Sequence, residues 1–544
     1  MRSLLSLNAL ISVASAIPYS TLKSHIGVTP TVKLGVATVT GVSAQLNSST
    51  LEKFLGIPFA RPPTGDLRYR APVGIEYYNS SFTATEYGAY CPQVPEIEPG
   101  FPSLTNNATV AQSEDCLTIN VIRPAGYDRA KLPVLAWIFG GGFEEGGSPD
   151  SDGSVIVQKS VDIGLPVIYV SFNYRVSGFG FLASQEVVNA GVANLGLQDQ
   201  RQALRWIQKY VGAFGGDSSK VTLFGASSGA ISVALQMLIN DGNTEGLFRA
   251  AFSQSGSPIP VGSYTHAQKW YDGAVAATNC TSASDTLACL RAAPYEALQG
   301  YFLTTPRKLS YQGLASAWLP RVDGKFLKDD PQQLVLKGSV TKIPFVSGDD
   351  DDEGTTFSLY QSNITTDSEF REWVQSDYFP NATAADLDLI MEWYSSDPAM
   401  GSPFGTGNNN TLYPQYKRIA AFQGDMVFQG PRRFYLQHRA ALQNAWSYLD
   451  KRDKTLSPLG SAHGTEMLSM YGSGNGTELQ DYVINFAYNL DPDGPTVPKW
   501  PRYTLASPKL LTLLDGTTPI TITEDTYRIE AMAGVTTIGL KYPI

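Results

Sequence analysis

One strand–turn–helix stretch constrains the fold of this chain more than any other feature. The apolar run Val221–Phe224 predicts a short buried strand, and Ile231–Leu238 predicts a helix. Between them lies Gly-x-Ser-x-Gly, with Ser227 at the apex and Gly225 and Gly229 on either side. A Cβ at either glycine would strike the neighbouring strand or helix, so the turn raises the serine hydroxyl above the sheet at a helix N-terminus. The helix dipole favours negative charge developing there, and we therefore expect Ser227 to be a nucleophile.

Alternating strands and helices predict an α/β fold. Apolar runs typical of strands occur at 117–122, 134–139, 166–172, 221–224, 250–253, 343–346 and 445–449, with a hairpin expected over 32–42 and an amphipathic helix over 197–214. This pattern predicts a central, mostly parallel twisted sheet with helices on both faces and ligands at the carboxyl ends of the strands. Residues 262–342 and 355–443 are expected to be large helical insertions that wall the pocket. No linker or repeat divides the 544 residues, so 17–544 should form one domain.

The first sixteen residues are typical of a secretory signal peptide. Arg2 is their only charge, Leu4–Val13 is mostly apolar, and Ala14-Ser15-Ala16 is a small-residue cleavage site. The mature chain should begin near Ile17, and loss of Arg2 takes its formal net charge from −10 to −11. An acidic, secreted chain without a basic patch argues against nucleic acid and anionic membranes as partners. No run is long enough for stable membrane insertion, which leaves contact with a lipid interface open.

Cysteines and glycosylation sequons agree with secretion. The four cysteines allow three disulfide connectivities, of which Cys91–Cys116 with Cys280–Cys289 closes two modest loops and is favoured. Their spacing fits no zinc pattern. Asn-x-Ser/Thr sequons predict a glycosylated surface at Asn47, Asn79, Asn107, Asn279, Asn363, Asn381, Asn409 and Asn475.

A serine nucleophile needs a base, which is usually histidine. Of the four histidines, His25 precedes the fold, whereas His266 and His438 lie in polar contexts typical of a solvated face. His463 lies in a Gly-bracketed loop after the last predicted central strand, where the chain order Ser, acid, His requires the base. The acid should follow the strand near 343–346, which leads into five consecutive carboxylates at 349–353. The pattern does not choose among the five, and a solvated or calcium-attracting turn is the alternative.

The oxyanion of an acyl-transfer intermediate also needs hydrogen-bond donors. The backbone N–H after the nucleophile is one donor, and here it belongs to Ser228. A glycine loop after an earlier strand supplies others, and the segment at 137–143 reads Trp-Ile-Phe-Gly-Gly-Gly-Phe. The alternative for that segment is a generic tight turn.

Taken together, these motifs resemble the type-B carboxylesterase/lipase family of α/β-hydrolases over most of the mature chain. Residues 214–229 resemble its active-site signature, and 114–120 (Glu-Asp-Cys-Leu-Thr-Ile-Asn) resemble its second signature. The family's acid motif is resembled by 352–355 and its histidine motif by 460–466. Its supporting-serine motif is resembled by 254–257, and its late Trp-Pro motif by 497–501. The segment 137–144 is similar to the fungal lipase and esterase branch.

The resemblance implies a role for each residue. It implies Ser227 as nucleophile, Glu353 as the acid and His463 as base, with Ser255 supporting the acid. It implies oxyanion donors at Gly141, Gly142 and Ser228, supports the sequential disulfides, and requires no metal or cofactor.

Departures from the family pattern bear on the substrate. Ala226 stands where the family commonly has Glu, and the loop between Cys91 and Cys116 contains no Trp, which argues against choline esters. That loop is short and Pro-rich, with scattered apolar residues, so we expect an esterase of moderate-to-long acyl chains. The alternatives are a true triacylglycerol lipase or sterol esterase, or a non-catalytic adhesion member of the fold. The sequence does not indicate an oligomeric state.

Overall fold

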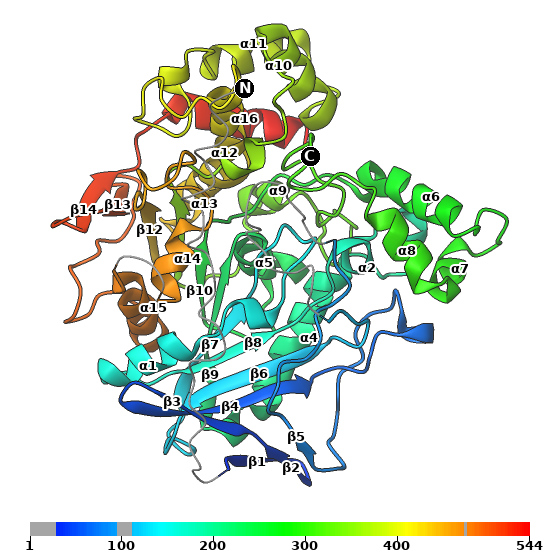
Figure 1. The fold of residues 1–544 in the computed structure, drawn as a ribbon, viewed down its shortest axis with the longest axis vertical. Helices are drawn as coiled ribbons and strands as arrows, with labels where there is room; N and C mark the ends of the chain where they lie inside the picture. Colours follow the sequence, from blue (N-terminus) through cyan, green and yellow to red (C-terminus); the bar gives the residue numbers. More distant parts are fainter. Residues whose placement is uncertain (1–28, 95–110, 473–475) are drawn as a thin grey trace, which may run out of the picture.

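The computed structural model describes residues 29–94, 111–472 and 476–544 (Figure 1). The predicted signal peptide at 1–16, His25, Asn107 and Asn475 lie outside the described residues. Among the described residues, none of the helices has the length and apolar character needed to cross a membrane.

A large mixed sheet forms the centre of the fold. Its eleven strands follow the order β14-β13-β12-β11-β10-β9-β7-β8-β6-β4-β3. The strands from β8 to β13 pair in parallel, and antiparallel pairs flank them at both edges. Their bounds are β3 Val42–Leu46, β4 Ser49–Pro58, β6 Thr118–Pro124, β7 Leu132–Ile138, β8 Ile168–Phe172, β9 Gly216–Ala226, β10 Ala250–Gln254, β11 Phe345–Asp350, β12 Ala445–Asp450, β13 Lys509–Leu513 and β14 Ile520–Glu524.

Burial explains why the central strands are apolar runs. Every residue of β6, β7, β8, β10, β11 and β12 is buried, as expected for strands covered on both faces. The expected α/β fold with a mostly parallel sheet is therefore confirmed. The expectation that β12 is the last central strand is wrong, because β13 pairs with it in parallel and β14 then extends the edge.

The predicted hairpin near the N-terminus belongs to a separate small sheet. β1 (Thr31–Leu34) and β2 (Ala37–Thr40) are antiparallel, and β5 (Phe82–Thr83) pairs with β2. This sheet lies at the opposite end of the molecule from α10, α11 and α16 (Figure 1).

Two groups of helices pack on the large sheet. α4 (Leu195–Tyr210) and α5 (Ser228–Gln236) contact each other and β9, while α1 (Ser154–Asp162) and α15 (Glu478–Asn489) contact each other and other strands of the sheet. The remaining helices are α2 Ser177–Phe181, α3 Gln185–Asn189, α6 Gln268–Ala277, α7 Thr286–Ala292, α8 Tyr295–Phe302, α9 Pro331–Leu336, α10 Asp367–Trp373, α11 Ala384–Trp393, α12 Tyr416–Gly424, α13 Gly430–Arg439, α14 Thr465–Met470 and α16 Ile529–Lys541.

Both predicted insertions carry helices at the carboxyl end of the sheet. α6 to α9 lie between β10 and β11, and α10 to α13 lie between β11 and β12. A π-helical turn, η12 (Asp425–Gln429), joins α12 to α13. In Figure 1, α6, α7 and α8 form one lobe, and α10, α11 and α16 form another.

The four cysteines pair sequentially, as favoured from the sequence. Cys91 bonds to Cys116, and Cys280 bonds to Cys289. The first disulfide fixes the chain just before β6, and the second joins the end of α6 to α7.

Candidate active site

Ser227 occupies the turn between β9 and α5, in a conformation that side chains rarely adopt. Its φ is 55° and its ψ is −130°. A Cβ on Gly229 would lie 2.0 Å from the carbonyl oxygen of Ile138, and one on Gly225 would lie 2.7 Å from the backbone of Gly229. Only glycine fits at either position, which is the physical reason for the motif. The turn leaves Ser227 half-buried at the carboxyl end of β9.

The structure brings Ser227, His463 and Glu353 together, although they are far apart in the sequence. His463 Nε2 lies 2.8 Å from Ser227 Oγ, and His463 Nδ1 lies 2.5 Å from Glu353 Oε2. Glu353 follows β11 and is 1% exposed, while His463 lies in the loop between β12 and α14. The rings of Phe357 and Phe428 lie 5.1 and 4.6 Å from the imidazole and shield it. His266 and His438, expected on solvated faces, are both exposed.

The five consecutive carboxylates at 349–353 do not form a solvated turn. All are buried, with exposed fractions of at most 4%. Asp349 forms an ion pair with Arg432, and both Asp351 and Asp352 form ion pairs with Lys454. The described part of the chain holds no group of three or more His, Cys, Asp or Glu side chains placed to bind a metal ion.

Asp350 connects the acid segment to the histidine loop. Its Oδ2 accepts the backbone N–H groups of Gly464 and Thr465 at 2.7 and 3.1 Å, and its own N–H donates to Glu353 Oε1 at 2.8 Å. Burial, together with the neighbouring carboxylate of Glu466, raises the pKa of Asp350 well above its usual range. The sequence pattern did not single out this residue, because its partners lie more than a hundred positions away.

Ser255 does not contact the acid as the resemblance implies. Its hydroxyl donates to Glu466 Oε1 at 2.8 Å, and a hydroxyl has a single hydrogen to give. Ser255 thus acts on the helix after His463 rather than on Glu353 directly.

The glycine loop after β7 lies against the Ser227 turn. Gly141 and Gly142 have φ values of 116° and 67°, which favour glycine, and a Cβ on Gly140 would lie 2.8 Å from Ser227 Cβ. Ser228 is the first residue of α5, so its N–H has no partner within the helix. Gly142, Ser227 and Ser228 line the same cavity, and the roles of the three predicted donors stay predictions.

A mostly apolar cavity opens at Ser227. As predicted, both insertions wall it. Its lining residues are Gly142, Phe143, Ser227, Ser228, Ile231 and Ile259, with Lys308, Leu314, Ser316 and Leu319 from the first insertion, Phe357, Val427 and Phe428 from the second, and Ile544. The sequence indicated only the ranges, since no local pattern marks single wall residues.

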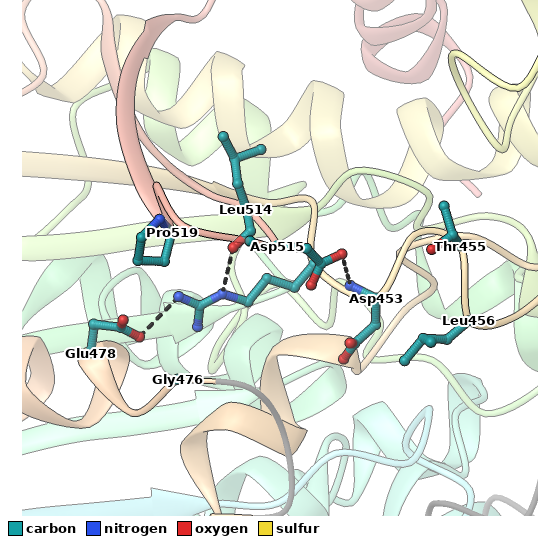
Figure 2. Close-up of a pocket in the computed structure, with 10 residues that line it drawn as sticks. Asp453, Thr455, Leu456, Gly476, Glu478, Leu514, Asp515 and Pro519 are labelled. Atoms are coloured by element: carbon teal, nitrogen blue, oxygen red, sulfur yellow. Dashed lines mark hydrogen bonds and ion pairs between the residues drawn. The ribbon is translucent and has the colours of Figure 1, made fainter.

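A second hollow lies away from these residues, where β12 and β13 end. Figure 2 shows that its polar groups are directed at one another: Arg452 Nη2 donates to Glu478 Oε2 at 2.9 Å, and the Asp453 N–H donates to Asp515 Oδ2 at 2.9 Å. None of the predicted active-site residues lines it. It therefore offers no candidate for the chemistry at Ser227.

The glycosylation sequons within the described residues are all accessible. Exposed asparagines occur at Asn47, Asn79, Asn279, Asn363, Asn381 and Asn409. Exposure is a requirement for glycan attachment, and their occupancy stays a prediction.

The chain is similar to known proteins over most of its length. Residues 28–531 match a family model described as the carboxylesterase family. The chain is 39% identical over 532 residues to Lipase 4 of Diutina rugosa, covering 93% of each protein, and 40% identical over 499 residues to the secreted triacylglycerol lipase LIP1 of Gibberella zeae, covering 87% of this chain and 85% of that one. Among solved structures, Aspergillus niger EstA matches with a TM-score of 0.80 and 28% identity over 95% of this chain and 99% of that chain.

Proposed function

The chain belongs to the carboxylesterase family and is a carboxylic ester hydrolase, and we propose that it acts through Ser227, Glu353 and His463 on esters of moderate-to-long acyl chains. The observation that carries the proposal is the position of His463, whose two ring nitrogens lie within hydrogen-bond distance of Ser227 Oγ and Glu353 Oε2. A base between a nucleophile and a buried carboxylate is the arrangement that serine acyl transfer requires.

In the proposed mechanism, Ser227 Oγ attacks the ester carbonyl while His463 Nε2 takes its proton. Glu353 holds the imidazole in the tautomer that leaves Nε2 free and stabilises the imidazolium that forms. The N–H groups of Gly141, Gly142 and Ser228 bind the oxyanion. His463 then protonates the leaving alcohol, and a water molecule hydrolyses the acyl-enzyme by the same steps.

The cavity supports an ester with an apolar acyl chain. Leu314, Leu319, Val427 and Phe428 line it, so an acyl chain that enters would contact apolar side chains from both insertions. A triacylglycerol lipase is the second candidate, because several relatives bear that kind of name, among them the secreted triacylglycerol lipase LIP1 of Gibberella zeae.

Secretion is part of the proposal. Relatives named as secreted support it, as do the two disulfides and the exposed sequons. N-terminal sequencing of the protein from culture medium should begin near Ile17. A chain that keeps its first sixteen residues would contradict the predicted cleavage.

Replacement of the nucleophile tests the function itself. Ser227→Ala should lower the turnover of a chromogenic ester by ~10³-fold or more, and should abolish labelling by a fluorophosphonate probe. Ser232→Ala, at a buried serine of α5 whose hydroxyl accepts a hydrogen bond from Gln200, is the matched control and should keep the label. Unlabelled wild-type protein without ester turnover would instead favour a non-catalytic adhesion role.

A further inference from the structure

We propose that Lys308 is a positioning residue of the oxyanion hole, which anchors the glycine loop after β7 and neutralises a buried carboxylate beside the oxyanion. This inference rests on the proposed function, because it concerns the loop that carries Gly141 and Gly142. Lys308 belongs to the first insertion, between α8 and α9, and is distant in the sequence from the loop that it contacts.

Lys308 makes three separate contacts with the glycine loop. A Cβ placed on Gly142 would lie 2.6 Å from Lys308 Cδ, so the lysine stem lies directly over that glycine. The backbone N–H of Lys308 donates to Glu144 Oε2 at 3.1 Å, and its Nζ lies 2.5 Å from Glu145 Oε1. Lys308 thus covers Gly142, an expected oxyanion donor, and contacts the side chains of Glu144 and Glu145 that follow this glycine.

Glu145 places a negative charge close to the proposed oxyanion. Its side chain is 1% exposed, and its N–H donates to the carbonyl of Gly141 at 3.2 Å. A Cβ on Gly141 would lie 3.3 Å from Glu145 Cγ, which puts the carboxylate within one side chain's length of the donor loop. In a site shielded from water, an uncompensated carboxylate there would oppose the charge that develops on the substrate oxygen.

Two other carboxyl groups lie near Glu145. Glu144 is its neighbour, and the nearby Asp150 accepts a hydrogen bond from Tyr90. Burial, with a smaller contribution from Glu145, raises the pKa of Asp150 to about 6. Lys308 places a positive charge directly against the Glu145 carboxylate, and the cavity-lining insertion thereby takes part in the chemistry as well as in substrate binding.

Removing only the charge of Lys308 separates this role from packing. Lys308→Met keeps a stem over Gly142 but removes the ammonium that contacts the Glu145 carboxylate. Without that ammonium, the carboxylate opposes the negative charge that develops on the oxyanion. We expect kcat per active site at pH 8 to fall by at least ~10-fold, with a smaller change in KM.

The second substitution, Glu145→Gln, identifies the charge as the cause. The double variant Lys308→Met/Glu145→Gln should recover kcat at pH 8, because the opposing carboxylate is then gone. Glu145→Gln alone should retain more kcat at pH 8 than Lys308→Met, and it provides this test even where Lys308→Met folds poorly. Active sites are counted by fluorophosphonate titration, so that unfolded protein does not lower kcat.

A matched control removes a buried lysine pair elsewhere. Lys53, which is 3% exposed, contacts Asp152 at 2.8 Å, and Lys53→Met should lower stability without altering kcat. The proposal is overturned if kcat of Lys308→Met matches wild type, or if the double variant is no better than Lys308→Met. Failure of the proposed function is a different result, namely wild-type turnover that survives Ser227→Ala.

Discussion

Glu353 Oε2 lies 2.5 Å from His463 Nδ1, and the other oxygen of the same carboxylate accepts the backbone N–H of Asp350 at 2.8 Å. Both oxygens of Glu353 are therefore held, one by the proposed base and one by the strand that precedes it. The contact between Glu353 and His463 therefore distinguishes Glu353 from the other four of the five consecutive carboxylates.

Glu353→Gln should lower kcat by on the order of 10²- to 10⁴-fold, because the amide no longer stabilises the imidazolium or its tautomer. Asp352→Asn should cost far less activity, since Asp352 accepts hydrogen bonds from Ser461 N–H and Phe404 N–H and contacts Lys454. Steady-state rates per titrated active site compare the two. The reverse ranking would show that Glu353 is not the acid.

Filling the cavity should shorten the preferred acyl chain. Leu319→Trp adds bulk to a wall supplied by the first insertion, so kcat/KM for p-nitrophenyl laurate should fall by ~10-fold or more while that for p-nitrophenyl acetate changes little. Leu505 is 56% exposed and does not line the cavity, so Leu505→Trp controls for the effect of adding a tryptophan side chain elsewhere. Equal loss on both esters would mean that the acyl chain does not occupy this cavity.

Burial raises the pKa of Asp450 to about 7, which predicts a pH dependence of stability. Between the ordinary aspartate pKa and pH 7 the unfolded chain loses this proton while the folded chain keeps it, so rising pH lowers the free energy of unfolding until about pH 7. Asp450→Asn keeps the oxygen that accepts the Arg452 N–H and cannot ionise. At pH 8 it should be more stable than wild type by about 1–3 kcal/mol, with a smaller gain at pH 5, as denaturant titration would measure. A gain that does not depend on pH would contradict this assignment.

The choice between esterase and lipase has a simple kinetic test. The sequence between Cys91 and Cys116 is Pro-rich and its apolar residues are scattered, so the rate on a soluble ester should saturate smoothly as concentration passes the solubility limit. Rates on dissolved and emulsified tributyrin measure this directly. A jump of several-fold on the emulsion would instead favour a lipase, as several relatives are named.

The central strands could be predicted from the sequence because full burial makes each of them an apolar run. The elbow at Ser227 could be predicted because only glycine fits at 225 and 229. β13 and β14 were not predicted. β13 is only five residues long, and Thr512 interrupts its three leucines, while β14 lies at the sheet edge and has no buried residue.

The choice of acid needed a family resemblance or coordinates. Asp349, Asp351 and Asp352 differ from Glu353 only in their partners, namely Arg432 and Lys454, which lie far along the chain. The contacts of Asp350 with the histidine loop and of Lys308 with Glu145 are likewise products of tertiary structure. No spacing within the sequence encodes them.

Because the proposed nucleophile, base and acid follow strands of the sheet while half of the residues that line the cavity come from two insertions, selectivity can change without altering the proposed catalytic residues. Variation at Leu314, Leu319 or Val427 leaves the backbone of the elbow untouched. Directed evolution of new ester preferences in this chain should therefore concentrate its libraries on those insertions, and should leave residue 308 unaltered.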